Sequence, residues 1–124
     1  LGANSGTIPT WLNEGLAMQL AGDQWQELKD VIHGEQALMP LTALEGSWDT
    51  LPAETASVAY AEANSATHYL IDQFGMHKVH EILAHLKARQ TITAAIHDKL
   101  LMSYDHFQQQ WADNFGGKLQ QPKS

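Results

Sequence analysis

The chain has 124 residues, of which 44% are hydrophobic, and this size and composition fit one soluble globular domain with a modest core. Its 14 acidic against 7 basic side chains give a net charge of −7, which argues against binding to nucleic acid or to an anionic membrane surface. The lack of cysteine excludes disulfides, thiolate nucleophiles and cysteine-ligated zinc, and no apolar run approaches the roughly 18 residues of a membrane span. The cellular compartment stays open.

The first predicted element is a helix from about Pro9 to Ala21. Proline suits the first turn of a helix, and Gly22 fits a left-handed terminator at its end. Residues 1–7 are rich in Gly, Ser and Asn and predict a loop. Because the sequence begins with Leu1 rather than Met, we expect it to be a piece of a longer chain.

This helix carries one carboxylate, Glu14, in otherwise oily surroundings. Between Trp11 and Ala21 the only other polar side chains are Asn13 and Gln19, so nearly every face is apolar and we expect the helix to be buried. A desolvated carboxylate is costly unless a cation, a metal or several donors meet it. Glu14 is therefore a candidate ligand.

The rest of the chain also predicts helices. Apolar and small residues recur at helical spacing, Gly and Pro separate the segments, and no alternating strand pattern occurs. Thr91 and Ser103 fit helix caps. We expect a helix over 23–33, a loop over 35–52 with one helical turn at 40–44, and helices over 53–74, 77–87, 91–100 and 103–115. The fold class is thus all-α, a compact array of about five to six helices, with 1–115 as a single helical domain and 116–124 as a flexible tail.

The histidines near residue 80 resemble the zinc-binding motif H-E-x-x-H, but their spacing differs from it. His80 and His85 are five residues apart and diverge by about 140° around a helix, whereas the four-residue spacing of H-E-x-x-H lets two imidazoles share an ion. His77, Glu81 and His85 follow one another at i+4, but they lie opposite the apolar stripe. We interpret them as a solvated face rather than a metal site.

One longer stretch points to a family. Residues 9–17, P-T-W-L-N-E-G-L-A, resemble the downstream glutamate helix of the gluzincin metallopeptidases, in particular the peptidase MA-like families and more distantly the aminopeptidase N-like enzymes. Further stretches resemble the family in the same order, so that the similarity covers about residues 8–115. They are the loop at Pro40–Leu44, the long helix from Ala59 to Gly75, and the final helix with Phe107 and Trp111.

The resemblance implies the carboxy-terminal helical part of a zincin-like metallopeptidase. In that family zinc is held by two histidines of an upstream H-E-x-x-H helix and by the glutamate of the N-E-G-x-A helix, so Glu14 is expected to be the third zinc ligand. Such a site hydrolyses peptide or protein substrates. No H-E-x-x-H occurs in the 124 residues. We therefore expect the intact protein to contain zinc and this fragment alone to hold none and to be inactive.

The resemblance gives two further residues a role. Tyr60 occupies a place similar to the tyrosine that stabilises the tetrahedral oxyanion in aminopeptidase N-like enzymes, and a phenol donor suits that task. The alternative interpretation is that Tyr60 packs at the edge of the core and only its hydroxyl meets solvent. Asn13 is expected to support the site from behind the ligand, or else to serve packing or capping.

Two expectations concern partners. The alternative to an enzyme is a non-catalytic helical interaction module, or a degenerate family member, in which Glu14 pairs with a buried cation. A missing metal helix would also leave apolar surface near Trp11 and Leu16. We expect the fragment to hide that surface by self-association.

Overall fold

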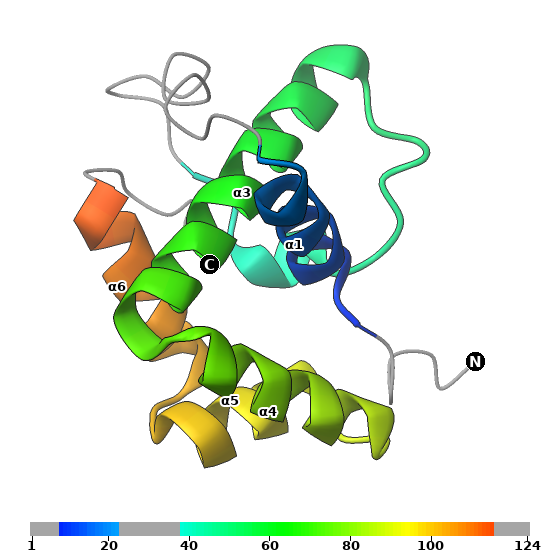
Figure 1. The fold of residues 1–124 in the computed structure, drawn as a ribbon. Helices are drawn as coiled ribbons and strands as arrows, with labels where there is room; N and C mark the ends of the chain where they lie inside the picture. The colour runs from blue at the N-terminus through cyan, green and yellow to red at the C-terminus, as the bar shows by residue number, and fades with distance from the viewer. Residues whose placement is uncertain (1–7, 23–37, 116–124) are drawn as a thin grey trace, which may run out of the picture.

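Five α-helices and one short 3-10 helix make up the described part of the chain in a computed structural model, which describes residues 8–22 and 38–115. The elements are α1 (Thr10–Ala21), η1 (Leu41–Leu44), α3 (Ala53–Phe74), α4 (Met76–Lys87), α5 (Ile92–Leu100) and α6 (Tyr104–Phe115) (Figure 1). No β-strand occurs in these two ranges, so the predicted all-α class is confirmed. The helix expected over 23–33, the loop over 1–7 and the tail over 116–124 lie outside the described residues.

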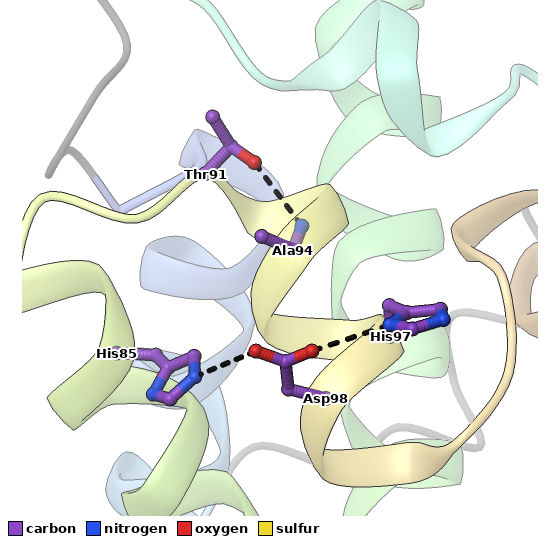
Figure 2. Close-up of polar contacts among 5 residues, drawn as sticks. All are labelled: His85, Thr91, Ala94, His97 and Asp98. Atoms are coloured by element: carbon purple, nitrogen blue, oxygen red, sulfur yellow. Dashed lines mark hydrogen bonds and ion pairs between the residues drawn. The ribbon is translucent and has the colours of Figure 1, made fainter.

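The ends of the helices follow the local chemistry of the sequence. Gly22 ends α1 with a φ of 79°, and Gly75 separates α3 from α4 with a φ of 88°, two backbone conformations that glycine adopts without strain. Thr91 caps α5 by accepting a hydrogen bond from the Ala94 amide at 3.1 Å (Figure 2). Ser103 accepts one from the His106 amide at 3.0 Å. Both predicted caps are confirmed.

The long helix α3 is the centre of the fold. α1 packs across one side of it, α6 packs against it as well, and α4 and α5 form a hairpin at its carboxyl end (Figure 1). Small and apolar residues at helical spacing form a stripe on α3, which is buried at Ala59, Ala63, Ala66 and Leu70 and half-buried at Phe74. In the described ranges no helix combines the length and apolar character needed to cross a membrane.

The segment before α3 is attached to the helices by both apolar and polar contacts. Leu38, Leu41 and Leu44 are buried in the common core. The amide of Met39 donates a hydrogen bond to the Glu62 carboxyl of α3 at 3.0 Å, and the amide of Leu41 donates one to the Gln108 side chain of α6 at 2.8 Å. The loop expected over 35–52 thus has a fixed position from residue 38 onward.

Candidate functional site

Glu14 lies in the second turn of α1 with its side chain half-buried. It forms no hydrogen bond or ion pair within the part of the chain that the structure describes. The expected burial of α1 holds for one side only, because α1 packs on α3 and η1 through Trp11, Leu12 and Gly15. Its outer face is exposed at Asn13, Ala17 and Leu20, the last to 81%. The Glu14 carboxylate is therefore partly solvated and available to a ligand.

The residue after Glu14 explains how α1 is held. Gly15 is buried against α3, and a Cβ atom added to it would lie 2.6 Å from the Ala63 carbonyl oxygen and 2.7 Å from the Thr67 Cβ, with the Thr67 Oγ1 closer still. Such distances are too short for real Cβ contacts, so only glycine permits this approach. The backbone of α1 thus packs directly on α3, and Glu14 is the residue next to this contact in the sequence.

A chain of hydrogen bonds fixes the amino-terminal end of α1. The buried indole of Trp11 donates to the Tyr104 hydroxyl of α6 at 2.8 Å, and that hydroxyl hydrogen-bonds to the Glu45 carboxyl. The Thr10 amide donates to the Glu45 carbonyl oxygen at 3.0 Å. Burial raises the pKa of Glu45, and the bond from Tyr104 opposes this by lowering it. One end of the glutamate helix is therefore tied to both η1 and α6.

These contacts correct the surface expected near Trp11. The Trp11 side chain has no exposed area, since it stacks on Phe107 at 6.4 Å between ring centroids, and Leu16 is half-buried against the core. The apolar side chain that α1 does expose is Leu20. Self-association stays a prediction, and its surface moves from Trp11 to the outer face of α1.

Tyr60 lies in the amino-terminal third of α3 and is 40% exposed. Its ring meets the edge of the Trp48 ring at 4.9 Å and an interplanar angle of 85°, and its hydroxyl forms no hydrogen bond with the described residues. The phenol is therefore free to donate to a ligand. The surroundings fit both interpretations of Tyr60, the oxyanion donor and the edge-of-core tyrosine, so its role stays a prediction. Asn13 is exposed on the outer face of α1, and its expected supporting role is likewise untested.

The structure adds a carboxyl group that the sequence interpretation missed. Glu62 is fully buried in α3, and burial raises its pKa to about 8 although the Met39 amide bond opposes the shift. The sequence already indicated a buried carboxyl here, since Glu62 stands among Ala59, Ala61 and Ala63, just as Glu14 stands among the apolar residues of its helix. Two carboxyls, one accessible and one buried, therefore lie on the two helices that pack together.

A sequence profile of the peptidase MA superfamily matches residues 2–115, which is most of the chain. The chain belongs to the peptidase MA superfamily. No curated protein and no solved structure matches it. The resemblance drawn from the glutamate helix is thus confirmed at the level of the superfamily, and membership indicates a peptidase-related function.

The histidines of this peptidase MA superfamily member do not form a metal site in the described ranges. His77 pairs with Glu81 at 2.9 Å, whereas His85 turns to Asp98 of α5 at 3.1 Å. His97 contacts the other oxygen of Asp98 at 3.2 Å, so one carboxylate lies between two imidazoles (Figure 2). These hydrogen bonds, from His97 first and then His85, lower the pKa of Asp98. Within residues 8–22 and 38–115 no three potential ligands converge.

Proposed function

We propose that this superfamily member is the carboxy-terminal helical part of a zinc metallopeptidase and that Glu14 supplies one of the zinc ligands. The observation that carries the proposal is that Glu14 has no bonding partner among the described residues. Glu14 is a half-buried carboxylate, it stands in the N-E-G-L-A helix, and the chain belongs to a peptidase superfamily. A carboxylate is a normal zinc ligand beside two imidazoles.

The described residues fit one part of such a site. Glu14 offers an accessible oxygen donor on a helix that is held near both ends. The Trp11 indole bonds to Tyr104 of α6 at 2.8 Å, and the Gln19 amide bonds to Asn64 of α3 at 2.6 Å. The other ligands have to come from outside the described residues, because no group of three converges within them. When bound, zinc would polarise the carbonyl of a peptide bond and activate water for hydrolysis near neutral pH.

Tyr60 has a proposed place in the same reaction. A phenol keeps its proton at neutral pH and can donate a hydrogen bond to the oxygen that becomes negative during peptide hydrolysis. The free hydroxyl and the 40% exposure of Tyr60 support this role. In the intact protein we expect Tyr60→Phe to lower kcat with little change in KM, since the bond is made mainly in the transition state.

The experiment that tests the proposal is the zinc content of the intact parent protein. We expect Glu14→Gln to reduce zinc affinity by a factor of about 10 or more, because the amide is a weak ligand that carries no charge. Glu54→Gln, which changes an exposed carboxylate in the first turn of α3, is the matched control and should retain the zinc. Equal zinc in the wild type and the Glu14 variant would remove Glu14 from the site. A parent without an H-E-x-x-H helix would favour the non-catalytic interaction module.

A further inference from the structure

Glu62 is a buried acid with too few hydrogen-bond donors to be an anion. Its side chain has no exposed area, Oε2 accepts one bond from the Met39 amide at 3.0 Å, and Oε1 is buried without a partner among the described residues. A buried carboxylate is stabilised by a cation or by two to three donors, and here a single amide is present. The pKa of about 8 that follows from burial leaves the group protonated at neutral pH.

The amide that Glu62 accepts from belongs to a segment that is tied to α1, α3 and α6 by four polar bonds. We call residues 38–48 the η1 segment. Besides the bond to Glu62, the Leu41 amide donates to Gln108, the Glu45 carbonyl oxygen accepts from the Thr10 amide, and the Glu45 carboxyl bonds to Tyr104. The buried leucines of the segment are Leu38, Leu41 and Leu44. These leucines belong to the common core of the helices.

The carboxyl end of the η1 segment contacts Tyr60. Trp48 ends the segment, its indole donates to the Leu44 carbonyl at 3.2 Å, and its ring packs on Tyr60. Glu62 and Tyr60 are two residues apart on α3, so one segment is held by the first and covers part of the second. Glu62 and Tyr60 therefore contact the same segment, at Met39 and at Trp48.

No described charge compensates Glu62. Only burial and the Met39 amide shift its pKa, and no ion pair contributes. The carboxyl and phenol groups on the neighbouring elements have other environments or partners: Glu14 is half-exposed on α1, Glu45 bonds to Tyr104, and Asp105 accepts from Gln108 at 3.1 Å. On α4, Glu81 is paired with His77 at 2.9 Å and with Lys78 at 3.5 Å.

We propose that the Glu62 carboxyl is a pH-operated latch, which holds the η1 segment on α3 while it is protonated and releases the segment, with its Trp48 cover on Tyr60, when it ionises. The ionised group needs water, and water reaches it when Leu38, Leu41 and Leu44 lift from the core. By linkage, the equilibrium constant for lifting rises about tenfold per pH unit from pH 4.5 to pH 8 and then levels off. The latch does not depend on the zinc site.

The test is hydrogen exchange by NMR on the 124-residue chain between pH 5 and pH 8. After correction for intrinsic exchange, the opening constants at the Met39 amide and the Trp48 indole should each rise about tenfold per pH unit. In Glu62→Gln, which keeps the shape and the acceptor, both should be independent of pH. Glu54→Gln, on the exposed start of α3, should behave as the wild type. The buried amide of Ile82 in α4 reports whether the whole fold opens.

Three results would overturn the latch. The first is the same slope in wild type and Glu62→Gln, and the second is an Ile82 amide whose opening rises in parallel with Met39. The third does not require the variant to fold: the carboxyl carbon shift of Glu62 in the wild-type chain should titrate near pH 8, and a midpoint near 4.5 would show that Glu62 is ionised and paired.

Discussion

Gly15 gives the sharpest test of how the glutamate helix is positioned. In Gly15→Ala the new Cβ would stand 2.6 Å from the Ala63 carbonyl oxygen, whereas ordinary contact begins at 3.4 Å, so α1 and α3 must part by about 1 Å. Overpacking against backbone costs about 3 kcal/mol, and the better helix propensity of alanine returns about 1 kcal/mol. We expect a net loss of about 2 kcal/mol in the free energy of unfolding.

The assay is urea unfolding of the 124-residue chain followed by far-UV circular dichroism. Gly46→Ala is the matched control, because nothing lies within 4 Å of its added Cβ, and its effect should stay within about 0.5 kcal/mol. Thr67→Ala in the Gly15→Ala background should restore part of the loss by removing the nearest atom. A Gly15→Ala chain as stable as the control would refute the close approach. In the intact protein, the same shift should weaken zinc binding through Glu14.

Three further predictions concern stability. Because the folded-state pKa of Glu62 is raised to about 8 from 4.5, the contribution of Glu62 to folding stability is fully present below pH 4.5 and is lost as pH rises towards 8. Thermal unfolding should find Glu62→Gln about 3 kcal/mol more stable than the wild type at pH 7 and equal to it at pH 4. A stability difference between the two chains that does not change with pH would contradict this. Tyr104→Phe leaves the Trp11 indole without its acceptor and should cost about 2 kcal/mol in urea unfolding, whereas Tyr69→Phe, whose hydroxyl has no such bond among the described residues, should cost less than half of that. Leu101→Gly should raise the unfolding free energy by about 0.5–1 kcal/mol, since Leu101 caps α5 at a φ of 60° with 85% exposure, and a destabilised variant would show that its side chain packs.

The helices could be predicted from the sequence because their signals are local. Gly22 and Gly75 end helices where they were expected to, and Thr91 and Ser103 cap them through atoms three residues away. A glycine terminator or a cap needs only its neighbours along the chain. The all-α class follows from the same periodicity.

The environment of the site could not be predicted in the same way, because it depends on contacts between distant parts of the chain. Trp11 is hidden by Tyr104 and Phe107, and the partner of Trp11 is 93 residues away in sequence. The apolar run of α1 predicted a buried helix, yet a helix with one main neighbour exposes its outer side. Glu62 was not predicted, because its only hydrogen bond among the described residues comes from the Met39 amide, 23 residues earlier in the sequence.

The packing of α1 on α3 also decides the order in which the chain assembles. α4 packs on α3 and on α5, which are its neighbours along the chain, whereas α1 has to wait for a helix that begins at Ala53. A twelve-residue helix is marginal in water without packing. During synthesis α1 therefore emerges before α3 and is completed late, after the two helices have met. The residue proposed to bind zinc acquires its place only when the central helix has been made.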